Sequence, residues 1–185
     1  GPVEGAAMGL IRHYFSLILF AAGLLAGVQV PNFVDQYEKR VDAHYREASA
    51  NLSGFQHIAD LYQHGSVERL IRQHDASSDP SFRSEAAPIR DLYRRKLRYE
   101  AELQALRAGF IRKVAHVFFA GDYPMLHETY EHYSANLPLN ATAALCGVSA
   151  AVTVCALFEV VVGLIRAVVV FNLRARRAAR AAADA

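Results

Sequence analysis

The histidines are the first residues of this chain that suggest chemistry, and the densest group is HETYEH at residues 127–132. A zincin site needs two histidines four residues apart on one helical face, with a glutamate directly after the first. Here the fourth residue after His127 is Glu131, so the motif fails. His127 with Glu131, and Glu128 with His132, could each supply two metal ligands. The polar surface of a helix explains the same residues, and we expect no metal site.

Other signatures of enzyme sites do not occur in the sequence. It has no phosphate-binding loop, no G-x-S-x-G turn and no dinucleotide fingerprint. The formal net charge is only +2 over 185 residues, and the basic residues are not interleaved with aromatic side chains that would stack on bases. We therefore expect no enzyme, no cofactor and no nucleic-acid partner.

Glu159 is the best functional candidate, because it lies inside the longest apolar run of the chain. That run covers residues 143–171 and carries one other charged residue, Arg166. A helix of this length crosses a bilayer core of about 30 Å at about 1.5 Å per residue. An ionisable group in hydrocarbon costs at least about 2.5–3.5 kcal/mol, so it usually faces a partner or a water-filled cavity. Arg166 is expected to extend its side chain to the inner head groups.

Arg12 and His13 are the partners expected for Glu159. Both lie in a second apolar segment, residues 10–30, with the sequence LIRHYFSLILFAAGLLAGVQV. In two antiparallel membrane helices with their outer ends level, these residues and Glu159 reach similar depths. We expect an Arg12–Glu159 or His13–Glu159 contact, within one chain or between subunits. A structural ion pair is favoured, and a pore-lining or proton-linked Glu159 is the alternative.

Small residues indicate a packing face on both apolar segments. Gly23 and Gly27 form a G-x-x-x-G motif, which lets two helix backbones approach closely in lipid. The second segment carries Gly147, Ala151 and, further along, Gly163. With the heptad pattern of the central region, these residues suggest self-association into a homo-oligomer.

The patterns together predict an all-α integral membrane protein in which two transmembrane helices flank a helical-bundle extracytoplasmic domain. Residues 1–7, GPVEGAA, resemble a protease scar and linker. The expected parts are transmembrane helix 1 at 8–31, a periplasmic helical domain at 32–140, transmembrane helix 2 at 141–173 and a basic cytoplasmic tail at 174–185. A cleaved signal peptide competes for the first segment, but no convincing small-x-small cleavage site precedes a mature start.

Basic residues set the expected orientation. Four arginines directly follow the second apolar segment, at Arg174, Arg176, Arg177 and Arg180. Such a cluster marks the cytoplasmic side of a membrane. We therefore expect a multi-pass protein of the bacterial inner membrane, with both termini cytoplasmic and the central domain periplasmic.

The central domain is expected to consist of amphipathic helices. In chain order we expect a helix over 33–62, single or broken near Ser53-Gly54, then a short helix over 67–74, a polar loop at 75–81, a long helix from Ser84 with an apolar seam reaching 117, and a last helix over 124–136. Residues 110–119, FIRKVAHVFF, are too few to span a membrane. We favour a place in the bundle core for them over a helix lying on the membrane surface.

A Pro-x-Phe-x-x-Gln-Tyr pattern lies at Pro31, Phe33, Gln36 and Tyr37, and a Leu-Pro-Leu lies at 137–139. Together with the two apolar segments and the helical region between them, these motifs resemble the bacterial DUF2937 family. The likeness covers residues 8 to about 173, although Asn140 and a run of small residues stand where the family pattern has Thr and then Glu-Gly. The resemblance implies a two-span inner-membrane protein of unassigned function, and it supplies no catalytic residue.

We therefore expect a homo-oligomeric structural or interaction protein of the inner membrane, accessory to an envelope complex. Its expected partners are the lipid bilayer, its own copies and other envelope proteins. An oligomeric ion channel or transport component with Glu159 near the conduction path is the first alternative, and a signal-transmitting membrane sensor is the second. Glu159 facing a wet axis would favour the channel, whereas Glu159 against Arg12 would favour the scaffold.

Overall fold

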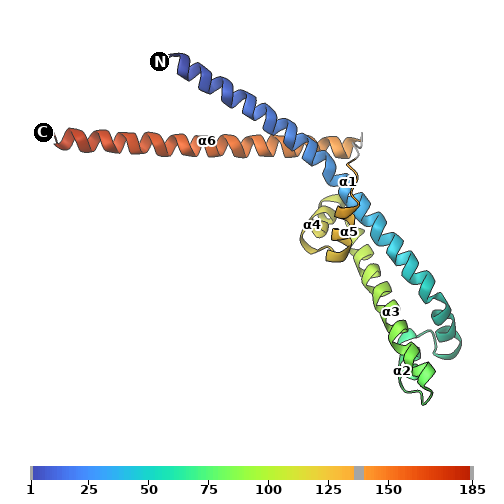
Figure 1. Ribbon diagram of the computed structural model, residues 1–185. Coiled ribbons are helices and arrows are strands. Elements are labelled where there is room, and N and C mark those ends of the chain that lie inside the picture. Colours follow the sequence, from blue (N-terminus) through green and yellow to red (C-terminus); the bar gives the residue numbers. More distant parts are fainter. Residues whose placement is uncertain (1, 136–139, 184–185) are drawn as a thin grey trace. The chain divides into compact units, whose positions relative to one another are not determined.

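A computed structural model describes the backbone of residues 2–135 and 140–183, and the side chains of residues 9–135 and 140–172 (Figure 1). All regular structure in these residues is helical, which confirms the expected fold class at this level. The helices are α1 (Pro2–Tyr62), α2 (Val67–Asp75), α3 (Pro80–Leu106), α4 (Phe110–Ala120), α5 (Tyr123–Glu131) and α6 (Ala141–Ala183). The Leu-Pro-Leu at 137–139 and the side chains of the tail arginines lie outside the described residues.

The chain forms two units. The two-helix unit comprises residues 1–32 and 135–185, and the central unit comprises residues 33–134. By length and composition, α1 from Gly9 and α6 as far as Asn172 are each able to cross a membrane. The most apolar stretch of α6 is not covered by the rest of the chain.

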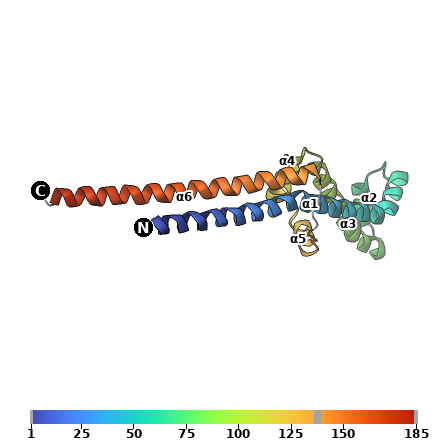
Figure 2. The same ribbon diagram turned by 90° about the horizontal axis from the view of Figure 1, so that it is seen from above.

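In the two-helix unit, the first part of α1 lies antiparallel against α6 (Figure 2). The backbones approach most closely where small residues meet: a Cβ built on Gly23 would lie 2.9 Å from the Cα of Ala151, and one on Gly27 would lie 2.8 Å from the Cα of Gly147. Further along the pair, the rings of Phe15 and Phe158 are 5.0 Å apart. The G-x-x-x-G motif therefore packs within one chain.

The long helix α1 ends where the backbone turns left-handed. The break considered near Ser53-Gly54 does not form, because α1 continues to Tyr62. His64 and Gly65 then take φ values of 51° and 81°, and the Gly65 N–H bonds the carbonyl oxygen of Ala59 at 3.0 Å. These bonds close the end of α1 in the way a left-handed residue usually closes a helix.

Three helix boundaries in the central unit differ from the sequence prediction. The helix α3 begins at Pro80 and not near Ser84, because the Asp79 carboxylate caps the Ser81 N–H at 2.8 Å. The apolar seam expected to reach residue 117 is divided, since α3 ends at Leu106 and α4 begins after Gly109. The last helix, α5, ends at Glu131 and does not reach 136.

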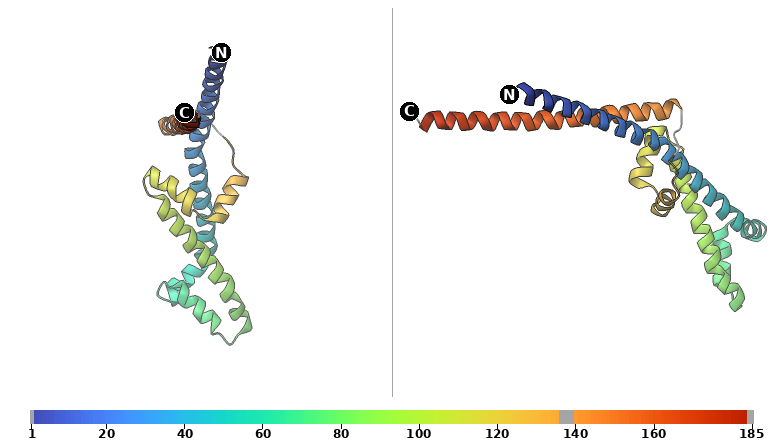
Figure 3. Two further views of the ribbon diagram at one scale, coloured as in Figure 1. Left: turned by 90° about the vertical axis from the view of Figure 1, so that its left-hand side faces the viewer. Right: turned by 45° about the horizontal axis from the view of Figure 1, so that its top comes forward.

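The central unit has two apolar clusters, with α2 at one end of α3 and α4 at the other (Figure 3). One cluster surrounds Tyr37 and includes Val41, Leu106 and Val117. The other joins α1, α2 and α3 and is built on Leu52, Val67, Leu70, Ile71 and Ile89. Two separate clusters agree with the sequence, in which the apolar periodicity of each helix is interrupted at the turn that follows it.

The core position favoured for residues 110–119 holds for only one side of α4, where Val117 lies in the cluster around Tyr37 and Val114 packs against it. In α4 only Val117 is buried, whereas Ile111 is 82% exposed and Phe119 is 91% exposed. With 11 residues, α4 presents one narrow stripe to the bundle, and Ile111 and Phe119 lie outside that stripe.

The Gly27 contact generates the first prediction. A Cβ at Gly27 would lie 2.5 Å from the Cys146 carbonyl oxygen and 2.7 Å from the Ala150 Cβ, whereas one at Gly163 meets nothing within 4 Å. We expect Gly27→Val to destabilise the two-helix unit by about 1–3 kcal/mol, because both contacts must open. Thermal unfolding of the purified chain in detergent measures this, with Gly163→Val as the matched control. Equal stability of the two variants would contradict the helix pairing.

Candidate functional site

Arg12 and Glu159 form an ion pair between the two apolar helices of one chain. The Arg12 Nε donates to Glu159 Oε1 at 3.1 Å, and the Arg12 Nη2 contacts Glu159 Oε2. Two parallel bonds from one guanidinium to one carboxylate are the strongest common form of such a pair. The side chains keep 37% and 45% of their surface exposed, so they face the surroundings of the helix pair as well as each other.

The other charged candidates of the two-helix unit lie apart from this pair. The ring of His13 lies against that of Tyr14, with centroids 6.1 Å apart. Arg166 lines a shallow hollow with Ala167, Val170 and Phe171. Of the two contacts expected for Glu159, the structure therefore forms the one with Arg12.

The small residues hold the register that brings the charges together. Gly23 lies against Ala151 and Gly27 against Gly147, while the Cys155 thiol lies 3.7 Å from the Ser16 carbonyl oxygen. Gly163 is beyond this contact zone.

The histidine-rich segment of α5 has one exposed side and one side that contacts α1. His127 Nδ1 lies 3.5 Å from Glu131 Oε2, and both side chains are more than half exposed. Glu128 does not pair with the ring of His132, whose Nδ1 lies 3.0 Å from the Glu128 backbone carbonyl oxygen. Among the described residues, no three or more His, Cys, Asp or Glu side chains are grouped to hold a metal ion.

Glu128 instead joins α5 to α1. Its Oε1 accepts from Arg40 Nη1 at 2.6 Å, and its Oε2 lies 3.0 Å from His44 Nε2. Burial acts to raise the pKa of Glu128, but the hydrogen bonds and charges of Arg40 and His44 outweigh it, so that the pKa lies below its ordinary value.

Tyr37 is the centre of a second polar group, which ties α1 to three other helices. Its hydroxyl donates to Glu102 Oε1 at 2.7 Å and accepts from the Asp122 N–H at 2.8 Å. His116 Nε2 lies 2.8 Å from the same Glu102 oxygen. Tyr37 has no exposed surface, and burial together with the Glu102 carboxylate holds the pKa of its phenol far above the ordinary value.

Asp122 continues this group into α5. Its Oδ1 caps the Met125 N–H at 3.3 Å, and its Oδ2 lies 3.3 Å from Arg98 Nε. Gly121 keeps the turn compact, because a Cβ there would lie 2.7 Å from the Val117 carbonyl oxygen and 3.2 Å from the Tyr37 hydroxyl. The arrangement fixes helices and offers no open reaction site.

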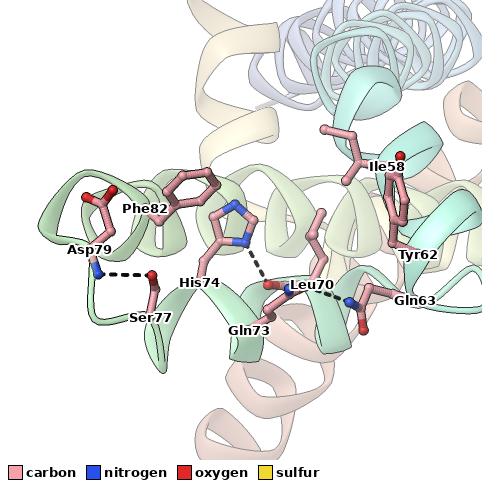
Figure 4. Close-up of a pocket in the computed structure, with 9 residues that line it drawn as sticks. All are labelled: Ile58, Tyr62, Gln63, Leu70, Gln73, His74, Ser77, Asp79 and Phe82. Atoms are coloured by element: carbon pink, nitrogen blue, oxygen red, sulfur yellow. Dashed lines mark hydrogen bonds between the residues drawn. The ribbon is translucent and has the colours of Figure 1, made fainter.

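An open cleft of about 630 Å³ lies at the α1–α2 turn and the start of α3 (Figure 4). Its walls combine apolar, aromatic and amide side chains, including Ile58, Tyr62 and Phe82. The buried His74 points its Nδ1 at the Leu70 carbonyl oxygen, 2.9 Å away.

The fold and these contacts define an all-helical protein with two helices long and apolar enough to cross a membrane. The chain belongs to the DUF2937 family, described as proteins of unknown function, and the family match covers residues 11–170. The resemblance noted from the sequence is thereby confirmed. No curated protein and no solved structure matches the chain.

Sequence reasoning missed the Tyr37 and Glu128 groups, because it named Tyr37 only within the family resemblance and Glu128 only as a metal-ligand candidate. One signal was present: Gln36 and Tyr37 belong to the most recognisable segment of the family resemblance. In the structure, Gln36 Nε2 donates to the Ser134 carbonyl oxygen at 3.1 Å, directly beside the Tyr37 group along the chain.

Loss of the Tyr37 hydroxyl is expected to loosen α4 and α5. Tyr37→Phe leaves the partly buried Glu102 oxygen and the Asp122 N–H without this partner, at a cost of about 1–3 kcal/mol. Hydrogen exchange of the full chain in detergent should show faster exchange in α4 and α5. The control Tyr62→Phe removes a hydroxyl from a side chain that is 73% exposed and should change nothing. Identical exchange in the two variants would contradict this role of Tyr37.

The lowered pKa of Glu128 predicts acid sensitivity. A carboxyl with a folded-state pKa below its unfolded value of about 4.5 stabilises the fold above that pH, and the stabilisation disappears as the pH falls through the folded value. Melting temperatures in detergent between neutral pH and pH 3 should therefore fall less steeply for Glu128→Gln than for the unmodified chain. Glu131→Gln, in the same helix, should keep the original slope; equal slopes for all three proteins would exclude this contribution of Glu128.

Proposed function

We propose that this protein is a structural or interaction protein of the bacterial inner membrane, anchored by α1 and α6. The observation that carries the proposal is the Arg12–Glu159 pair within one chain. A charge in hydrocarbon requires a partner, and this pair supplies one without a second subunit or a water-filled path. Glu159 is thus a structural group that fixes how the two membrane helices meet.

The outer surface of α6 supports an anchor more than a channel. The side chains exposed around Glu159 along the helix are apolar, including Leu157, Val160, Val161 and Leu164. A conduction path would need polar groups in succession along one face. An oligomeric channel with Glu159 on its axis is therefore the alternative function, and the experiment below distinguishes it from the anchor.

The proposed topology places both termini in the cytoplasm and the central unit in the periplasm. The four arginines that follow residue 173 support the cytoplasmic end by the positive-inside rule. The contact of Gln36 with Ser134 supports a central unit with both connections at one end, because Gln36 lies near the start of that unit and Ser134 is its last residue. A domain inserted between two antiparallel spans needs its connections at one end.

We further propose that the protein forms homo-oligomers and binds other envelope proteins. The packing face at Gly23, Gly27, Gly147 and Ala151 is occupied within the chain, so another copy must use a different surface. Gly163, with open space around it, remains available on α6.

The ion pair is tested by removing its charges singly and together. Glu159→Gln leaves the Arg12 charge without its partner, so we expect the chain to lose about 2.5–3.5 kcal/mol of stability in the bilayer. The double variant Arg12→Gln with Glu159→Gln should recover most of it, because no charge remains. Thermal unfolding in nanodiscs, with the mass of each complex, measures both effects. In liposomes we expect no ion flux from the unmodified chain or from either variant.

The channel alternative predicts different results in the same preparations. A closed ring of four or more subunits, with ion flux that Glu159→Gln alters, would contradict the structural role. Equal stability of the single and double variants would contradict the pairing.

A further inference from the structure

The helix α4 carries an apolar face that the central unit does not cover. Ile111 is 82% exposed, Phe118 52% and Phe119 91%, and Ala115 between them is exposed as well. At 3.6 residues per turn, these four positions fall within about a third of the helix circumference. Arg112, also exposed, borders the same face. Basic residues beside bulky apolar ones are typical of helices that lie in a membrane interface.

Polar contacts on the other sides of α4 hold this face outward. Lys113 Nζ lies 2.5 Å from Glu38 Oε2 on α1, and His116 Nε2 lies 2.8 Å from Glu102 Oε1 on α3. Val117 is fully buried in the cluster around Tyr37. The helix therefore cannot turn to bury its exposed face without breaking both of these polar contacts.

The apolar face lies at the end of the central unit where the chain enters and leaves. The rings of Phe118 and Phe33 are stacked with centroids 5.8 Å apart, and those of Phe33 and Tyr133 are 5.5 Å apart. Phe33 is the first residue of the central unit and follows the first apolar segment after Pro31 and Asn32, while Tyr133 is next to the last residue of the unit. Phe118 thus packs on the residue at which the chain enters the central unit.

We propose that α4 binds the bilayer surface, with Ile111, Phe118 and Phe119 inserted among the acyl chains and Arg112 directed to anionic phosphate head groups. The inference rests on the proposed membrane anchoring and deepens it by giving the central unit its own lipid contact. The bilayer is favoured as the occupant over a second copy because Phe118 packs on Phe33, which is continuous in sequence with the first apolar segment. A helix in this position buries its apolar face about 5–10 Å into the interface.

The chain contains no tryptophan, so single substitutions give clean fluorescence reporters. Three full-length variants are reconstituted in phosphatidylcholine–phosphatidylglycerol vesicles, with or without brominated acyl chains: Phe119→Trp on α4, Phe20→Trp in the first apolar segment and Tyr62→Trp at the distant cleft. We expect brominated lipid to lower the emission of the first two about twofold or more, and to leave the third unchanged. Ile111→Trp reports on the same face in case Phe119→Trp does not fold.

The controls separate failure of this inference from failure of membrane anchoring. Quenching in Phe20→Trp without quenching in Phe119→Trp or Ile111→Trp would overturn the lipid contact while leaving the anchor in place. In that case, protection of the α4 indole from aqueous acrylamide would assign the face to a second copy, and full access would leave it in solvent. Quenching in neither segment would overturn both proposals. Weaker quenching of Phe119→Trp when Arg112→Gln is added, in vesicles containing phosphatidylglycerol, would support the head-group contact.

Discussion

In the proposed membrane, a carboxylate within an apolar helix needs an opposite charge or water beside it, and the pairing of Glu159 with Arg12 organises the two-helix unit. Arg12 meets Glu159 with two bonds, but the pair forms only if the helix backbones lie close and in one register. Gly27 and Gly147 supply that closeness, since a Cβ on either would clash with the opposite helix. In the proposed bilayer, charge pairing and small-residue packing therefore depend on each other.

The central unit meets a related constraint in a different way. A buried phenol needs its hydrogen bonds satisfied, and Tyr37 satisfies them with groups from separate helices, Glu102 and the Asp122 N–H. These bonds, together with the Glu128 pair to Arg40 and His44, hold α4 and α5 beside α1. The position of α4 in turn leaves its apolar face outward, so the proposed lipid contact depends on the polar group beneath it.

The sequence predicted the parts of this structure that depend on periodicity and on chain-local signals. Apolar length marked the two long helices, and the short helix expected over 67–74 begins where α2 begins. The depth argument named Arg12 and His13 for Glu159, because a helix axis converts residue number into distance, but it did not choose between them. The Tyr37 group was not predictable in this way, since Tyr37 and Glu102 are 65 positions apart and meet only after the bundle forms. The interpretation of 110–119 as core held only for the side of α4 that carries Val117, because apolar residues give the same sequence pattern whether or not the rest of the chain covers them.

Distance measurement by magic-angle-spinning solid-state NMR in bilayers tests the central claim most directly. Arginine labelled with ¹⁵N and glutamate labelled with ¹³C would report a short guanidinium–carboxylate contact, assigned by its loss in Glu159→Gln. If the pair forms within one chain, the contact signal normalised to the amount of labelled protein stays constant when labelled protein is diluted with an excess of unlabelled protein. Loss of the contact on dilution would place Arg12 and Glu159 on different subunits, and its absence at every dilution would contradict the pair itself.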